Sequence, residues 1–144
     1  MYCKNQNLKN YILGTNQDVS KGLTEGHRGY FATESKDVAS KFGKVHEVAI
    51  DQSKLFDARN PKQLIKFVAA FEKKFPRGHV LNRGIRDIKK TAESGNYSFY
   101  EDIQTQFLLE DLGYKGNWQI EKGANTFRVF NKEDFKIGKR AEAD

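Results

Sequence analysis

The apolar positions in the N-terminal third of the chain fall in short runs that are typical of strands. Residues 11–13 (Tyr-Ile-Leu) form one run, which ends at Gly14 and Thr15 and predicts a first strand followed by a sharp turn. Residues 30–32 (Tyr-Phe-Ala) have the aromatic, half-buried character of a second strand. Residues 45–50 contain alternating apolar positions and predict a third.

A short helix is predicted between the second and third strands. Ser35 stands where a helix N-cap belongs, because its hydroxyl can accept a hydrogen bond from an otherwise unpaired backbone amide. Val38, Ala39 and Phe42, at i, i+1 and i+4, give this helix one apolar face. Gly43 is expected to end it in a left-handed backbone conformation.

The middle of the chain predicts three helices, at residues 61–75, 81–94 and 99–112. The first begins at Asn60-Pro61, a cap followed by proline, and the third ends at Gly113. Each helix has an apolar stripe that is expected to face the core. The stripes consist of Leu64, Ile65, Val68, Phe71 and Phe75; of Leu81, Ile85 and Ile88; and of Tyr100, Ile103, Phe107 and Leu108.

The C-terminal part returns to strands. Residues 117–120 and 126–130 predict a hairpin joined by a loop around Gly123 and Asn125. Phe135 and Ile137 predict a final short edge contact. Strands at both ends with helices between them predict an α+β fold whose sheet is assembled from distant parts of the chain. We expect one domain over residues 1–138, with residues 139–144 fraying.

The composition narrows the classes of protein. The chain has 144 residues, 38% of them hydrophobic, which is enough for one core. No apolar run has signal-peptide or transmembrane length, so a cytoplasmic location is expected. The single cysteine, Cys3, excludes an internal disulfide. The three histidines lack ligand spacing, so a metal site is not expected.

The positive charge of the chain is concentrated in one segment. The formal net charge is +6, and residues 61–90 contain nine basic and two acidic residues, a net of 9 − 2 = +7. Such a segment favours an acidic partner surface or a nucleic acid, although a solvated helix face is the simpler explanation. The basic residues are Lys62, Lys66, Lys73, Lys74, Arg77, Arg83, Arg86, Lys89 and Lys90.

Three segments resemble the ADP-ribosyltransferase family, in the order in which that family has them. Residues 11–15 (YILGT) are similar to its first-strand motif, an apolar run followed by His-Gly-Thr. Residues 26–42 are similar to its Gly-rich turn, its Tyr-Phe-Ala strand and its Ser-x-x-x-Ala-x-x-Tyr/Phe helix. Residues 113–131 resemble the closing segment of small bacterial and phage-borne members, in which a Gly-Tyr-x-Gly turn precedes a strand that ends near a glutamate.

The resemblance implies a split antiparallel sheet with a helical block between its halves and a cleft that holds NAD⁺. The backbone around Leu13, Gly14 and Thr15 would contact the nicotinamide amide. Tyr30, followed by Phe31 in the same strand, would stack on the nicotinamide ring, and Ser35 or Thr33 would bond near the ribose. Glu121 would be the catalytic carboxylate, which stabilises the positive charge that develops at the anomeric carbon as nicotinamide leaves.

Two positions depart from the family pattern. The family histidine falls at Leu13, so either His27 or Arg28 supplies the missing donor, or NAD⁺ binds in a changed pose, or activity has been lost. The acid is either at Glu121 or, by analogy with the eukaryotic polymerase branch, at Thr126, in which case the chain lacks it. Simpler roles also fit: Tyr30 as a core aromatic, Ser35 as an N-cap alone, and Glu121 as a hairpin-turn residue.

Two functional hypotheses follow. The first is a mono-ADP-ribosyltransferase that uses NAD⁺ to modify a host macromolecule, with the basic segment docking the target. Small members of this kind include phage and mobile-element effectors against host defence, such as anti-CRISPR proteins. The second is a binding module that has kept the fold and lost the chemistry, and that blocks a partner or a nucleic-acid site through its basic segment. Leu13 favours the second hypothesis, whereas Tyr30, Ser35 and Glu121 favour the first.

Overall fold

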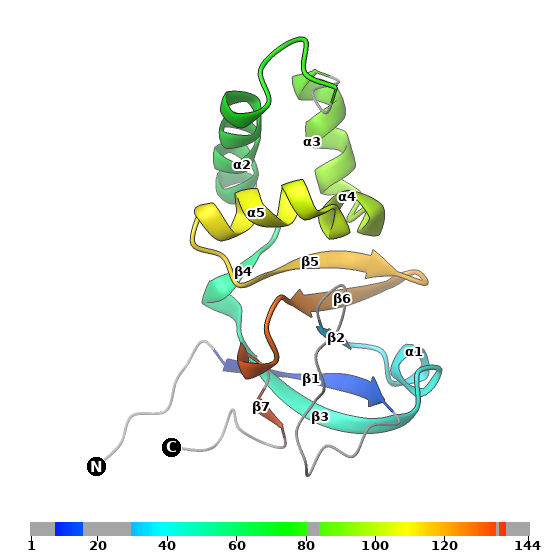
Figure 1. The fold of residues 1–144 in the computed structure, drawn as a ribbon. Helices are drawn as coiled ribbons and strands as arrows, with labels where there is room; N and C mark the ends of the chain where they lie inside the picture. The colour runs from blue at the N-terminus through cyan, green and yellow to red at the C-terminus, as the bar shows by residue number, and fades with distance from the viewer. Residues whose placement is uncertain (1–7, 16–29, 81–83, 135, 138–144) are drawn as a thin grey trace, which may run out of the picture.

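The computed structural model describes residues 8–15, 30–80, 84–134 and 136–137, with the backbone alone at residues 8, 15, 132, 136 and 137. These residues form an α+β fold with one mixed sheet (Figure 1), and the elements follow the predicted order except for an additional short strand at residues 55–56 and a third helix that is divided in two. The strands are β1 (Leu8–Thr15), β2 (Tyr30–Thr33), β3 (Lys44–Asp51), β4 (Leu55–Phe56), β5 (Gly116–Glu121), β6 (Ala124–Val129) and β7 (Lys136–Ile137). The α-helices are α1 (Lys36–Ser40), α2 (Pro61–Lys74), α3 (Ile85–Glu93), α4 (Tyr97–Glu101) and α5 (Ile103–Asp111), with 3₁₀ turns at Gln52–Lys54 and Lys132–Asp134.

The strands of the described residues form one sheet in the order β4-β5-β6-β2-β1-β3-β7. β4 runs parallel to β5, and the other neighbours are antiparallel. β1 and β3 pair along their whole lengths, whereas β1 and β2 are in register only at Ile12 and Thr33. The sheet therefore has two well-paired parts, β4-β5-β6-β2 and β1-β3-β7, with a narrow join. An ADP-ribosyltransferase-type split at this join stays a prediction.

The local signals in the sequence gave the correct ends for several elements. The Asn60 side chain accepts hydrogen bonds from the backbone amides of Lys62 and Gln63, at 3.0 and 3.3 Å, and α2 begins with Pro61 as expected. The hairpin turns at Lys122 and Gly123, with φ values of 49° and 78°. Positive φ at both central residues is the requirement of a type I′ turn, which matches the twist of paired strands. The hairpin prediction is confirmed, but the predicted loop is too long, because Asn125 lies within β6 and pairs with Ile120.

The third predicted helix is wrong, because two helices occupy that segment. Asp102 separates α4 from α5: its backbone is extended, with ψ at 131°, and its carboxylate accepts a hydrogen bond from the amide of Gln104 at 2.9 Å. Asp102 is thus the N-cap of α5, a role that the short acidic side chain favours over a helix-interior position. The break changes the direction in which the following side chains point.

Four residues that the sequence placed in the core are exposed: Ile65, Ile85, Ile103 and Phe107. In α2 the buried face instead consists of Leu64, Phe67, Val68 and Phe71, at i, i+3, i+4 and i+7. Ile65 lies outside that stripe and is 67% exposed. In α5 the buried side chains are Thr105, Leu108 and Leu109, and Ile103 and Phe107 lie on the other side. Leu81 falls outside the described residues.

An aromatic cluster joins the helices to the sheet. α2 and α3 stand side by side at one end of the molecule, and α5 crosses between them and β5 (Figure 1). The rings of Phe56 and Phe67 lie 4.8 Å apart, and Phe67 also contacts Phe71 and Phe99, each at 5.9 Å. Tyr100 is fully buried here and donates a hydrogen bond to the carbonyl of Ala92 at 2.7 Å. None of the described helices has the length and apolar character needed to cross a membrane.

A buried arginine lies between the sheet and the helices. Arg128 on β6 is 1% exposed, and its guanidinium donates hydrogen bonds to the Tyr100 carbonyl and the Asn117 side chain, both at 3.2 Å. It also donates to Gln106 on α5. A buried charge needs such partners, because the desolvated guanidinium has no water to bond. Arg128 therefore ties β6 to the helical block.

Candidate functional site around helix α1

Several of the residues predicted for the site gather around α1. Ser35 is its N-cap, and the Ser35 hydroxyl accepts a hydrogen bond from the amide of Val38 at 3.2 Å. Gly14 on β1 lies directly under the helix. A Cβ atom at this position would be 1.7 Å from the Ala39 carbonyl oxygen, so the close approach of β1 and α1 requires glycine. The capping role of Ser35 is confirmed, while a role of either residue toward NAD⁺ stays a prediction.

Thr33, Ser35 and Glu121 lie at the same end of the sheet. β2 and β5 flank β6, with Thr33 opposite Thr126 and Glu121 opposite Ala124. The Thr33 hydroxyl donates a hydrogen bond to the Asn125 carbonyl at 2.8 Å. Glu121 is half-buried and is the last residue of β5 before the turn. The structure thus brings together three of the side chains that the sequence singled out.

Phe42 adds an exposed aromatic ring to this end of the molecule. It follows the last residue of α1 by two positions, and it is 49% exposed. The sequence had placed Phe42 on the apolar face of the helix, but α1 ends at Ser40, so Phe42 does not share that face. The ammonium of Lys122 lies 5.0 Å from the centre of the Phe42 ring, within the range of a cation–π contact. We call Gly14, Ser35, Phe42, Glu121 and Lys122 the α1 site.

Tyr30 is not brought to Glu121. Tyr30 lies opposite Val129, which in turn lies opposite Gly116, the first residue of β5. Glu121 is five residues further along β5, which at 3.4 Å per residue is about 17 Å away along the strand direction. Tyr30 is also 8% exposed and packs in the main core. This position fits the role of a core aromatic, and its stacking on nicotinamide stays a prediction.

The remaining residues predicted to bind NAD⁺ are placed only in part. Leu13 is buried in the core, and Phe31 is half-buried in β2. The backbone of Thr15 pairs with Lys44 at the end of β1, but its side chain lies outside the described residues. His27 and Arg28 also lie outside them, so their role as replacement donors stays a prediction.

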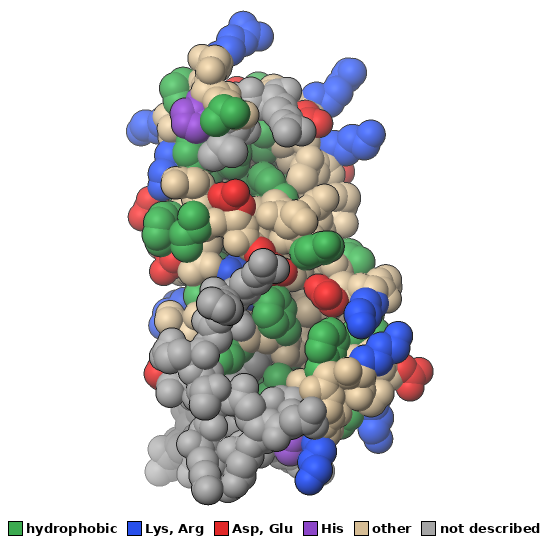
Figure 2. Space-filling model, turned by 45° about the vertical axis from the view of Figure 1, so that its right-hand side comes forward, with side chains coloured by type: hydrophobic (Ala, Val, Ile, Leu, Met, Phe, Trp, Pro, Cys, Tyr) green, Lys and Arg blue, Asp and Glu red, His purple; other side chains and the backbone are tan. Residues whose placement is uncertain are grey.

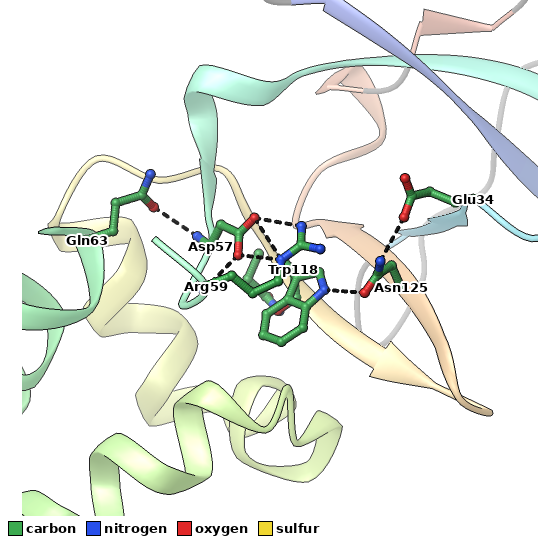
Figure 3. Close-up of polar contacts among 7 residues, drawn as sticks. Glu34, Asp57, Arg59, Gln63, Trp118 and Asn125 are labelled. Atoms are coloured by element: carbon green, nitrogen blue, oxygen red, sulfur yellow. Dashed lines mark hydrogen bonds and ion pairs between the residues drawn. The ribbon is translucent and has the colours of Figure 1, made fainter. Parts of the chain in front are cut away.

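A chain of polar contacts that the sequence did not predict runs beside the α1 site (Figure 3). Glu34, at the end of β2, accepts a hydrogen bond from the Asn125 amide nitrogen at 2.9 Å. The Asn125 oxygen accepts another from the indole N–H of Trp118, also at 2.9 Å. The Arg59 guanidinium lies 4.8 Å from the centre of the Trp118 ring and forms a 2.7 Å ion pair with Asp57. This polar chain holds the Glu34 carboxylate in a fixed position.

Glu34 affects a buried tyrosine on the neighbouring strand. Burial, followed by the negative charge of Glu34, raises the pKa of Tyr11 to about 12, while a hydrogen bond with Gln52 lowers it. The Tyr11 ring packs against Phe127, with the two ring centres 4.2 Å apart. The neutral phenol is therefore the form that the folded protein favours.

We expect part of the stability to be lost as the pH rises from about 10 to about 12. The folded pKa of Tyr11 is raised above the value of the unfolded chain, so its contribution is complete below the unfolded pKa and disappears as the pH passes the folded one. The thermal midpoint measured against pH should fall less steeply in Tyr11→Phe than in the wild type. Tyr97→Phe, at an exposed position, is the matched control. An equally steep fall of the thermal midpoint in Tyr11→Phe would contradict a raised pKa of Tyr11 as the cause.

The predicted partner-binding residues form the basic face of the helical block. Eight of the nine are described, all are exposed, and they lie on α2, on α3 and in the connection that follows α2. Figure 2 shows Lys and Arg side chains projecting from this end of the molecule. They are Lys62, Lys66, Lys73, Lys74, Arg77, Arg86, Lys89 and Lys90. Arg83 lies outside the described residues.

A groove between α2 and α3 opens on the basic face. Its volume is about 380 Å³, and its apolar lining comes from the start of α2 and the residues before it. Arg59 and Lys89 contribute cations, and Glu93 forms a 3.9 Å ion pair with Lys89. The apolar lining residues are Ala58, Pro61, Leu64 and Ile65. None of the residues predicted to bind NAD⁺ lines this groove.

Comparison with known proteins gives a likeness of fold. No family model matches the chain, and no curated protein matches it in sequence. A solved structure described as the crystal structure of an anti-CRISPR protein is similar, with a TM-score of 0.56 and 10% sequence identity. The likeness covers 93% of this chain and 96% of the other. The two chains therefore share their overall fold over nearly their full lengths.

Proposed function

We propose that this protein inhibits a CRISPR defence system in a bacterial host, and that it does so by transferring ADP-ribose from NAD⁺ to a component of that system. The observation that carries the proposal is the likeness to an anti-CRISPR protein, which extends over 93% of the chain. The chemistry rests on the α1 site, where residues named by the resemblance to ADP-ribosyltransferases lie together. It also rests on the narrow join between β1 and β2, which is where the split of the sheet implied by the resemblance would fall.

The α1 site offers a carboxylate for this reaction. NAD⁺ supplies an activated glycosidic bond between the ribose and a cationic nicotinamide ring. The half-buried carboxylate of Glu121 would stabilise the positive charge that appears on the ribose as this bond breaks. A nucleophile of the target would then bond to the anomeric carbon and lose its proton, while the bonding electrons leave with nicotinamide.

Phe42 offers the nicotinamide ring more exposed surface than Tyr30 does. The ammonium of Lys122 lies 5.0 Å from the centre of the Phe42 ring, so a flat cationic ring would displace Lys122 and take over the same electrostatic attraction. Tyr30 offers little of its surface, because it is 8% exposed. We therefore assign the stacking role to Phe42 within this proposal. Ser35 and the backbone at Gly14 would complete the surroundings of the ribose and amide.

The proposal predicts that NAD⁺ raises the thermal midpoint of the protein. A ligand at about 100 times its dissociation constant adds roughly 2.7 kcal/mol to the free energy of unfolding, which moves the midpoint by several degrees. The shift at millimolar NAD⁺ should disappear in Phe42→Ala and persist in Tyr97→Ala, an exposed aromatic of similar exposure on α4. The absence of a shift in the wild type, or its survival in Phe42→Ala, would contradict an NAD⁺ site built on α1.

A second function, inhibition by binding alone, is favoured by one observation. Leu13 occupies the position of the family histidine and is buried in the core, so it supplies no donor to NAD⁺. Under this alternative the basic face would block a host protein or a nucleic-acid site. Reversing several charges between Lys62 and Lys90 would then abolish inhibition of the host system, while changes in the α1 site would leave it unaltered.

A further inference from the structure

The helical block is divided into a basic part and an acidic part. Residues 61–90 contain nine basic and two acidic residues. The next 24 residues, 91–114, contain five acidic residues and no lysine, arginine or histidine. The acidic residues are Glu93, Glu101, Asp102, Glu110 and Asp111. Opposite charges of this density on one surface attract each other when two copies meet in the right orientation.

The acidic part carries exposed apolar side chains. Ile103 and Phe107 are 52% and 47% exposed, and their spacing of four residues puts them on one face of α5. Glu110 and Asp111 follow Phe107 by three and four residues, and both are exposed. Large apolar side chains that share a face with charged ones are typical of protein contacts. We call these four residues the α5 face.

The basic part offers a complementary receptor. The groove between α2 and α3 is lined by apolar side chains, of which Ile65 is the most exposed, and by the cations Arg59 and Lys89. Lys62 and Lys66 are exposed on α2, on either side of Ile65 in the sequence. Glu93 also lines the groove and pairs with Lys89, so the positive charge beside its apolar surface comes chiefly from Lys62 and Lys66. The α5 face presents apolar surface beside Glu110 and Asp111, of which Asp111 pairs with Lys74 at 3.4 Å.

We propose that two copies of this chain pair, with the α5 face of each seated in the α2–α3 groove of the other. The groove and the α5 face belong to the same helical block, so a two-fold axis would make both contacts at once and close the assembly at a dimer. This inference goes beyond the proposed function and is independent of it. Pairing covers Lys62, Lys66 and Lys89, so it would compete with a target for the basic face.

The first test is the mass of the full-length protein in solution, measured by sedimentation velocity. At low salt and roughly 100 μM we expect a dimer, because a contact of micromolar affinity would be nearly saturated there. At about 1 M salt the Debye length falls to roughly 3 Å, and the dimer should dissociate. A monomer at low salt, a mass that grows beyond the dimer, or a dimer that disappears after nuclease treatment would overturn the proposal.

The decisive test is a charge exchange between the two surfaces. Lys66→Glu and Glu110→Lys should each weaken pairing by about tenfold or more. In a two-fold dimer residue 66 of each copy faces residue 110 of the other, so either variant alone places two like charges opposite each other in both contacts. An equimolar mixture of the two variants should restore the dimer, because every contact in the mixed pair is again between opposite charges. Lys44→Glu and Glu47→Lys, at exposed positions on β3, are the matched controls and should dimerise like the wild type.

Failure of the mixture to dimerise, or equal loss of pairing in the β3 controls, would overturn the proposal. The thermal midpoint of each variant separates lost pairing from lost folding. If Glu110→Lys proves unstable, Asp111→Lys replaces it on the same face. Phe107→Ser tests the apolar part and should also weaken pairing; a dimer of unchanged affinity would exclude the α5 face as the contact.

Discussion

Replacing Arg128 with methionine is expected to lower the free energy of unfolding by about 1–3 kcal/mol, the usual cost of leaving buried hydrogen-bond acceptors without their donor. The Arg128 guanidinium donates to the carbonyl of Tyr100 and to the side chains of Asn117 and Gln106. Methionine fills a similar space but leaves these acceptors without a donor, and unpaired buried polar groups are costly.

The charge around Arg128 adds to this effect. Burial lowers the pKa of Arg128 to about 10, and the negative charges of Glu101 and Glu110 raise it. At neutral pH the guanidinium is therefore charged. Glu101 also accepts a hydrogen bond from the Gln119 side chain at 2.9 Å. Removing the charge of Arg128 is therefore expected to weaken the attachment of β5 to the helices as well.

Equilibrium unfolding in urea measures this prediction directly. Arg59→Met is the matched control, since Arg59, like Arg128, lies over an aromatic ring and donates hydrogen bonds, but its side chain is 44% exposed. Exposed ion pairs contribute only about 0–1 kcal/mol, so we expect a loss of that order. A loss of less than about 1 kcal/mol in Arg128→Met would mean that the network is satisfied without the guanidinium.

The parts of the fold that could be predicted from the sequence are those set by local chemistry. Ser35 and Asn60 are caps because a short polar side chain reaches the amides two or three residues later, and this needs no tertiary context. Gly113 ends α5 with φ at 92°, a conformation that glycine adopts without strain. The hairpin was predictable from Gly123, whose φ is 78°, whereas the positive φ of Lys122 was not.

The faces of α5 could not be predicted, because apolar side chains occur on both sides of this helix. Ile103 and Phe107 are exposed, while Leu108 and Leu109 are buried. The spacing of apolar residues therefore does not indicate which side of α5 faces the core. Because the chain breaks at Asp102, the buried positions of α4 do not predict those of α5 either. The same break leaves an apolar surface outside the core, on which the proposed pairing depends.

The candidate site could be predicted only in part, for a related reason. Ser35 and Glu121 lie in motifs that are continuous in the sequence. The contact between Glu34 and Asn125 joins residues 91 positions apart, and nothing in either local sequence indicates it. Phe42 was visible as the aromatic at the end of its motif, but its exposure depends on where α1 ends. Long-range register and helix ends are what the sequence pattern leaves undetermined.

Replacing Glu121 with glutamine is expected to lower the rate of ADP-ribosyl transfer by about 100- to 1,000-fold, if the proposed chemistry is correct. The amide is nearly isosteric with the carboxylate but carries no negative charge to stabilise the cationic ribose. Glu121 is half-buried beside a turn and opposite Ala124, so the fold should tolerate the change. The assay follows labelled ADP-ribose from NAD⁺ onto a purified CRISPR effector complex that the wild type inhibits.

Glu34→Gln is the matched control, because Glu34 directly follows β2 at this end of the sheet and is held by Asn125. A severe loss in Glu121→Gln with a small one in Glu34→Gln would identify Glu121 as the catalytic acid. The reverse order would move that role to Glu34, whose carboxylate the polar chain already orients. Inhibition by the wild type without any transferred label, retained in Glu121→Gln and lost on charge reversal of the basic face, would establish inhibition by binding alone.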